Sequence, residues 1–135
     1  MKDLTQLKVV DVMSRGVVAV DLNDSFENII KTFNEAKVHA VIVIGPGGEF
    51  MGVVSHSDIV EALHKHKEKI FSLTAEDIMC PKPYTVDANA NLKEAAAIMI
   101  QKKVHRLLVL SSHSGKLLPV GILSATDIIY AIATS

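Results

Sequence analysis

Two seven-residue segments place a glycine, a serine and an aspartate at the same spacing. Residues 52–58 are Gly-Val-Val-Ser-His-Ser-Asp, and residues 121–127 are Gly-Ile-Leu-Ser-Ala-Thr-Asp. A serine hydroxyl and the free backbone amides at the start of a helix can bind a phosphate. An aspartate at the same place repels phosphate but accepts hydrogen bonds from the vicinal hydroxyls of a ribose. The two segments therefore predict twin sites for a nucleoside or nucleotide.

The same spacing has a second interpretation, because Ser-x-x-Asp at a helix start also resembles a capping box. A cap would use Ser55 with Asp58, and Ser124 with Asp127. One such segment on its own would favour capping. Two segments with a matched glycine exceed what capping requires, so we expect ligand binding at both.

A second pair of motifs puts a histidine at the start of an apolar run. Residues 38–41 are Val-His-Ala-Val, and residues 104–107 are Val-His-Arg-Leu. Arg106 is the best phosphate ligand of the chain, because a guanidinium is permanently charged and can hold two oxygens at once. Ala40 stands at the matching place and carries no charge. We therefore expect two unequal sites.

These motifs belong to an internal repeat. A shift of 66 residues superimposes Asp11, Met13, His39 and others on Asp77, Met79 and His105, and from Gly52 onward the matching shift is 69. The extra residues fall in a longer hairpin loop between 110 and 121, where a structural repeat tolerates insertion. The hydrophobic pattern of each copy predicts the order β-α-β-β-α.

We expect strands at 17–20, 38–44 and 50–54 in the first copy and at 84–86, 104–110 and 117–123 in the second. Polar caps at 23–25 and 89–91 precede one helix of each copy, and Asp58 and Asp127 begin the other. Because neither sheet could bury both of its faces alone, the copies should pack about a pseudo-twofold axis. The fold class is α/β (α+β), with repeats at 8–66 and 74–133.

Composition limits the possible functions. The chain has 135 residues, of which 49% are hydrophobic and 21% charged, and its net charge of -1 argues against binding nucleic acid or an anionic membrane by bulk electrostatics. No apolar run is long enough to span a membrane, and a single cysteine, Cys80, excludes an internal disulfide. We expect a cytoplasmic protein. No catalytic triad, paired carboxylates or metal cluster stands out, so we expect no enzyme activity, no metal and no catalytic cofactor.

The ordered set of motifs resembles the cystathionine-β-synthase (CBS) domain, two copies of which form a Bateman module. The resemblance covers about residues 8–133. It rests on Asp-Val-Met at 11–13 and Asp-Ile-Met at 77–79, on the two histidine motifs, and on both Gly-x-x-Ser-x-x-Asp segments. Each motif alone is weak, but the set occurs twice in the same order. The chain departs from the family at Ala40, and at Ile42 and Leu108, where many members carry proline.

The resemblance implies a cleft between the copies that binds adenosine-containing ligands such as AMP, ADP, ATP or S-adenosylmethionine. Asp58 and Asp127 would hold ribose, Ser55 and Ser124 would lie near ribose or phosphate, and His39, His105 and Arg106 would face phosphates. The backbone at Val18 and Tyr84 would contact adenine, each reaching a ligand whose ribose the other copy holds. The nucleotide-binding set is Val18, His39, Ser55, Asp58, Tyr84, His105, Arg106, Ser124, Thr126 and Asp127.

The implied function is a regulatory module that pairs into a homodimer and signals to a separate effector protein. A ligand-independent dimerisation scaffold is the main alternative. Nucleic-acid binding is a third possibility, which the near-neutral charge and the scarcity of aromatic residues count against.

Overall fold

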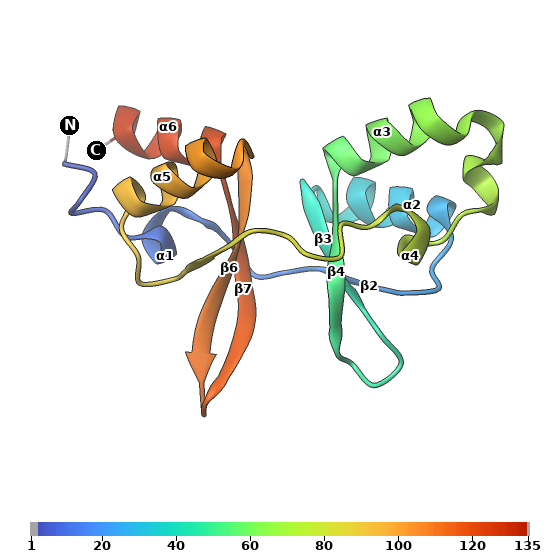
Figure 1. The fold of residues 1–135 in the computed structure, drawn as a ribbon, viewed down its shortest axis with the longest axis horizontal. Coiled ribbons are helices and arrows are strands. Elements are labelled where there is room, and N and C mark those ends of the chain that lie inside the picture. The colour runs from blue at the N-terminus through green and yellow to red at the C-terminus, as the bar shows by residue number, and fades with distance from the viewer. Residues whose placement is uncertain (1–2, 135) are drawn as a thin grey trace. The chain divides into compact units, whose positions relative to one another are not determined.

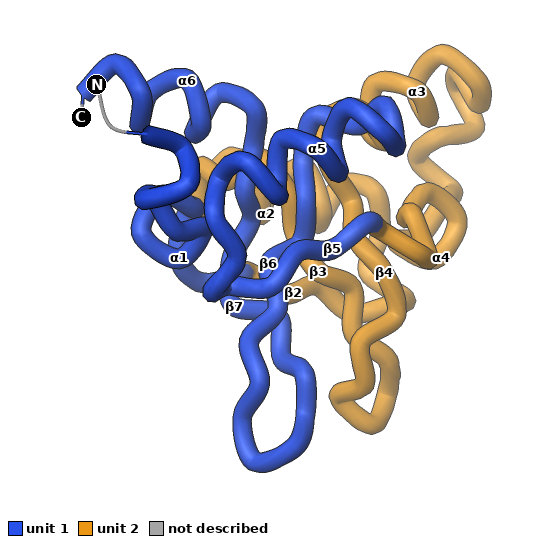
Figure 2. The backbone as a smooth tube through the Cα atoms, turned by 60° about the vertical axis from the view of Figure 1, so that its left-hand side comes forward, with its two compact units in different colours: residues 1–17, 84–135 blue, residues 18–83 orange. Residues whose placement is uncertain are grey.

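The structure is a computed structural model that describes residues 3–134. The chain forms two compact units, which Figure 2 shows in different colours. Of the described residues, 18–83 make up unit 2, and 3–17 together with 84–134 make up unit 1. Residues 3–17 therefore belong to the same unit as the second repeat. The segment that joins the two repeats belongs to the same unit as the first repeat.

Unit 2 has a three-stranded sheet in the order β2-β3-β4, in which β2 runs parallel and β4 antiparallel to β3 (Figure 1). Its strands are β2 (Ala19–Asp21), β3 (Ala40–Ile44) and β4 (Phe50–Ser55). Its helices are α2 (Phe26–Ala36), α3 (His56–His66), the 3₁₀ helix η1 (Lys67–Ser72) and α4 (Ala75–Ile78).

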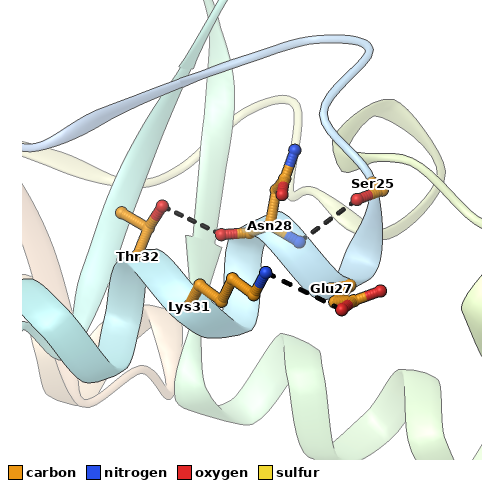
Figure 3. A network of polar contacts seen from close by, with 5 residues as sticks. All are labelled: Ser25, Glu27, Asn28, Lys31 and Thr32. Carbon is orange, nitrogen blue, oxygen red and sulfur yellow. Dashed lines mark hydrogen bonds and ion pairs between the residues drawn. The ribbon is translucent and has the colours of Figure 1, made fainter.

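The start of α2 shows how local chemistry sets a helix boundary (Figure 3). Ser25 has extended backbone and its hydroxyl accepts the Asn28 N–H at 3.1 Å, which satisfies one of the free amides of the first turn. One turn later, Lys31 Nζ lies 3.8 Å from Glu27 Oε1, and the Thr32 hydroxyl donates to the Asn28 carbonyl. The polar cap predicted at 23–25 is confirmed.

Unit 1 repeats this arrangement and adds a strand. Its sheet has the order β1-β7-β6-β5, with β5 parallel and β7 antiparallel to β6. The strands are β1 (Ser14–Arg15), β5 (Thr85–Asp87), β6 (Arg106–His113) and β7 (Lys116–Ser124). The helices are α1 (Val9–Val12), α5 (Leu92–Lys102) and α6 (Ala125–Thr134). Asn91 caps α5 by accepting the Glu94 N–H at 2.9 Å.

Each unit has its own hydrophobic core. In unit 2 the alternate residues Val41 and Val43 of β3 pack with Ile29 of α2, all at 1% exposure or less. In unit 1 Leu107 and Val109 of β6 pack in the same way with Leu92 of α5. Alternation along the central strands therefore presents one set of side chains to the helices, as the period of two in a strand requires.

The predicted mixed α and β fold is confirmed, and so is the order β-α-β-β-α in both copies. One prediction is wrong in detail: α3 begins at His56 and α6 at Ala125, not at Asp58 and Asp127. The serine is the residue that ends the strand and caps the helix, so the aspartate falls within the first turn. Among residues 3–134, no helix is both long enough and apolar enough to cross a membrane.

Candidate functional site

The topology of each sheet gathers the signature residues at one edge. A strand and its parallel neighbour start at the same edge, and an antiparallel neighbour ends there. In unit 2 the starts of β2 and β3 therefore lie beside the end of β4, and in unit 1 the starts of β5 and β6 lie beside the end of β7. All ten predicted nucleotide-binding residues lie at or next to these two edges, four of them in unit 2 and six in unit 1.

In unit 1, Arg106 is the first residue of β6 and pairs across the sheet with Ser124, the last residue of β7. His105 is exposed, and its carbonyl accepts the Ala125 N–H at 2.9 Å, which ties the start of α6 to the start of β6. Tyr84 precedes β5, and its carbonyl accepts the Leu108 N–H at 3.0 Å. Histidine, arginine and serine therefore occupy one end of this sheet.

In unit 2, the matching contacts hold His39 beside α3. The His39 carbonyl accepts the His56 N–H at 3.2 Å, and the two imidazole rings lie 5.0 Å apart between centroids. Both histidines line a pocket of about 630 Å³ between α2 and α3, together with Phe33, whose ring centroid is 5.3 Å from that of His56. The Val18 carbonyl accepts the Ile42 N–H at 2.9 Å.

The serine and aspartate of each signature bond to each other. In unit 2, Asp58 Oδ2 accepts the Ser55 N–H at 2.7 Å and the Ser55 hydroxyl at 2.9 Å, and Ser55 Oγ accepts the Asp58 N–H at 3.4 Å. In unit 1, Asp127 Oδ2 accepts the Ser124 N–H at 2.8 Å, and Ser124 Oγ accepts the Asp127 N–H at 3.1 Å. The capping interpretation is thus correct for both signatures.

The helix caps do not use all the hydrogen-bond acceptor positions of these two aspartates. Both helix caps use the Oδ2 atom of the carboxylate, and Asp58 and Asp127 are each partly exposed. A carboxylate offers about four acceptor positions on its two oxygens, so a capping aspartate can still accept a hydroxyl from a ligand. The exposed Thr126 lies between Ser124 and Asp127 in the first turn of α6.

The glycine of the signature has a structural role. A Cβ on Gly121 would lie 2.5 Å from the Ser14 carbonyl oxygen and 2.7 Å from Met13 Sδ. A Cβ on Gly52 would lie 2.6 Å from the Cys80 carbonyl oxygen. In both units a segment from near the start of the other repeat pairs with the strand here, through β1 in unit 1 and through the bridge between Val53 and Cys80 in unit 2. The matched glycines are therefore explained by close backbone approach rather than by a ligand.

Among the described residues, Arg106 has a buried polar atom that no other group satisfies by hydrogen bonding. Its side chain is partly buried, and its Nε is buried without a hydrogen-bond partner. Among residues 3–134, Arg106 forms no ion pair within 4.0 Å. A buried donor without a partner costs about 1–3 kcal/mol, more when the group is charged. An anion with several oxygens would remove this cost. At the matching place, Ala40 is 7% exposed and offers no donor.

Two residues of these edges were not predicted from the sequence. His56 lies against His39, and Lys102 Nζ lies 5.5 Å from the centroid of the Tyr84 ring. His56 stands inside the first signature, next to Ser55, so its place near the site could have been inferred from the spacing. Lys102 gives no such signal, because a lysine near the end of a helix is ordinarily explained by the helix dipole.

The comparisons with known proteins assign the family. The CBS domain model matches residues 9–65 and 75–134. The chain belongs to the CBS-domain family and carries two CBS domains in tandem.

Curated relatives carry the same region in different settings. An uncharacterized protein of Methanopyrus kandleri is 24% identical over 97% of this chain and 67% of its own length. Inosine-5'-monophosphate dehydrogenase of Korarchaeum cryptofilum is 32% identical over 86% of this chain, but the match spans only 22% of the dehydrogenase. The shared region is thus a small part of that enzyme.

Solved structures share the fold. A conserved protein from Pyrococcus horikoshii is 22% identical with a TM-score of 0.82, over 97% of this chain and 95% of that one. CBSX2 in complex with AMP is 28% identical with a TM-score of 0.71, over 95% of this chain and 97% of that one. The CBS domain of a bacterial CNNM/CorC family Mg2+ transporter in complex with ATP is 22% identical with a TM-score of 0.75, over 96% and 89%. Two neighbours with this fold therefore bind adenine nucleotides.

Proposed function

We propose that this chain is a regulatory module that binds an adenosine nucleotide of the AMP, ADP or ATP class and signals its presence to a separate protein. Membership in the CBS-domain family and the AMP complex of CBSX2 support the class of ligand. Binding would act by differential affinity for two states of the module or of its partner.

The observation that carries the proposal is the environment of Arg106. Its guanidinium has a buried Nε without a partner, and it starts β6 directly opposite Ser124. Guanidinium groups bind phosphate oxygens through two parallel hydrogen bonds, which gives both affinity and orientation. Asp127, three residues beyond Ser124, supplies an acceptor that suits ribose hydroxyls. One edge of unit 1 therefore offers complementary groups for the two polar parts of a nucleotide.

Unit 2 offers a weaker version of the same edge. Ser55 and Asp58 form the matching cap, and His39 takes the place of His105, but Ala40 supplies no cation where unit 1 has Arg106. We propose that the phosphate affinity contributed by unit 2 is lower. The two nucleotide sites are then unequal, and at low ligand concentration one of them fills first.

Calorimetric titration of the chain with AMP, ADP, ATP and S-adenosylmethionine tests the proposal. We expect a dissociation constant well below millimolar for at least one of the three nucleotides. Absence of binding by all three nucleotides up to about a millimolar would contradict it. Binding of S-adenosylmethionine alone would leave a regulatory ligand but overturn the role given to Arg106, because that ligand has no phosphate.

A specific observation also supports a homodimer. On α6, Ile129 and Tyr130 are 68% and 70% exposed, and Ile100 on α5 is 81% exposed. Exposed large apolar side chains on two helices of one unit provide apolar area that association would cover. We propose that a second copy of the chain covers it. A dimer that forms equally with and without nucleotide, in a chain that binds none, would favour the scaffold interpretation instead.

A further inference from the structure

The pocket between α2 and α3 of unit 2 has an apolar floor and an apolar rim. Its volume is about 630 Å³, which lies within the roughly 300–1,000 Å³ of pockets that hold small molecules. Of its lining residues, Phe33 and Ile59 are buried and form the floor. Ile30 and Val60 are 38% and 65% exposed and stand at the rim. The pocket can therefore receive the apolar body of a ligand between two helices.

Three nitrogen-bearing side chains line one end of this pocket. Lys37 directly follows α2, His39 directly precedes β3, and His56 is the first residue of α3. Because β3 and β4 are antiparallel, with Ala40 opposite Ser55, the end of α2 meets the start of α3 here. The two imidazole rings lie 5.0 Å apart between centroids. The polar groups thus gather at one end, and the apolar residues of both helices extend away from it.

This polar end suits an anion. No aspartate or glutamate is among the described residues that line the pocket, and among residues 3–134 Lys37 forms no ion pair within 4.0 Å. An ammonium donates through three N–H bonds, and an imidazole donates through a ring N–H. Charge-assisted hydrogen bonds from such donors to a carboxylate are shorter and stronger than those between neutral groups. A carboxylate at this end would therefore be held by charge and by hydrogen bonds.

We propose that this pocket binds a small amphipathic carboxylate, with its apolar body between α2 and α3 and its carboxylate at Lys37, His39 and His56. A neutral alcohol would leave the positive end without an anion, and an alkylammonium would be repelled by it. Of the proposed nucleotide-binding residues, only His39 lines this pocket. The inference thus goes beyond nucleotide binding at the sheet edges and does not depend on it.

Calorimetric titration with octanoate and three analogues tests which features the pocket recognises. Octanoate should bind with a dissociation constant below about a millimolar. Hexanoate, which is shorter by two methylenes, should bind about four- to sixteenfold more weakly, because each buried methylene contributes a factor of about two to four. 1-Octanol keeps the chain without the charge and should bind at least about tenfold more weakly. Octylammonium carries the opposite charge and should bind more weakly still.

A matched pair of lysine variants locates the carboxylate. Lys37→Met keeps the apolar stem but removes the charge, so it should weaken octanoate binding about five- to fiftyfold and leave 1-octanol within about twofold. Lys103 directly follows α5 in unit 1 with the same left-handed backbone, φ 58° against 53° for Lys37. Lys103→Met therefore makes the same change of charge and of backbone setting in the other unit. It should leave octanoate affinity within about twofold.

Two further variants test the other end of the groove and the second imidazole. Val60→Asp places a carboxylate on the exposed rim and should weaken octanoate binding at least about tenfold by repulsion and by loss of apolar contact. His56→Ala copies Ala125, which stands at the matching place in unit 1, and should weaken octanoate binding about two- to tenfold.

The outcomes separate this inference from its alternatives. Equal affinity for octanoate and 1-octanol, or equal losses in Lys37→Met and Lys103→Met, overturns it, because the positive end would then not hold the carboxylate. Absence of octanoate binding by the parent chain also overturns it. If Val60→Asp in that case converts a dimeric parent chain into monomers, a second copy occupies the pocket instead. Octanoate binding by a chain that binds no AMP supports this inference and contradicts the proposed function.

Discussion

Ser124 and Asp127 hold each other in both directions: the Ser124 N–H donates to the Asp127 carboxylate at 2.8 Å, and the Asp127 N–H donates to the Ser124 hydroxyl at 3.1 Å. The pair fixes the first turn of α6 against the end of β7. A ligand would meet a carboxylate whose position is already set, so little ordering would be needed on binding. The same residues can therefore serve the fold and the proposed site, and their two roles need separate measurements.

Asp127→Ala should lose both the helix cap and the ribose contact. The cap is worth about 1 kcal/mol of unfolding free energy. A matched control is Asp77→Ala: Asp77 Oδ2 accepts the Thr74 N–H at 2.9 Å in a similar reciprocal cap at the start of α4, in unit 2. Both variants should unfold at a lower temperature, but only Asp127→Ala should lose most of the rise in melting temperature that AMP produces.

One outcome of these melting experiments would contradict the ribose role of Asp127. If AMP raises the melting temperature of Asp127→Ala and Asp77→Ala by equal amounts, then Asp127 only caps its helix. The ribose role would then have to be withdrawn for unit 1.

Arg106→Gln should weaken AMP binding about ten- to hundredfold, because hydrogen bonds to charged groups contribute about 1.5–3 kcal/mol each. The chain has one other arginine, Arg15, which is exposed on β1 of the same unit. Arg15→Gln removes the same charge and should leave affinity within about twofold. Equal losses in the two variants would show that net charge, rather than the position of Arg106, attracts the ligand. Calorimetry of both variants at one ionic strength decides.

The sequence predicts the strands, helices and repeat well because each has a local signal: alternating apolar residues, a capping side chain or a turn. It does not predict α1 and α4, because these helices are too short to show a hydrophobic period. It also does not predict that β1 pairs with β7 in unit 1, because that pairing joins residues far apart in the chain. For the same reason the sequence alone associates the signature glycine with the ligand chemistry of Ser124 and Asp127. Only the position of the Ser14 carbonyl, 2.5 Å from where a Cβ would stand on Gly121, reveals its structural cause.

Gly121→Ala should destabilise unit 1 by about 1–3 kcal/mol, because its Cβ would meet the Ser14 backbone, which cannot move without breaking the pairing of β1 with β7. Gly47→Ala is the matched control. Its Cβ would approach only the flexible end of the Glu49 side chain, at 2.7 Å, so the change should cost little. Urea unfolding of both variants measures the difference, and similar stabilities would contradict the close-approach argument.

Ile129→Asp should convert the proposed homodimer into monomers. It places a charge among the exposed apolar side chains of α6, where burial against a second copy would leave that charge unpaired. Leu117→Asp is a control of similar exposure, 64% against 68%, on β7 and away from α6. Light scattering after size exclusion gives the mass of each variant. A monomeric parent chain, or dimers in both variants, would exclude α6 as the interface.

Leu108→Pro should change base selectivity at the cost of stability. Proline has no N–H, so the Tyr84 carbonyl would lose the hydrogen bond that it now accepts from Leu108 at 3.0 Å. The freed carbonyl could then accept the amino group of adenine, which hypoxanthine lacks. We expect unfolding free energy to fall by about 1–3 kcal/mol and the preference for AMP over IMP to rise several-fold. Calorimetry with both nucleotides checks the second effect. If the preference stays as in the parent chain, the Tyr84 carbonyl takes no part in binding the base, whether or not the sheet occupies it.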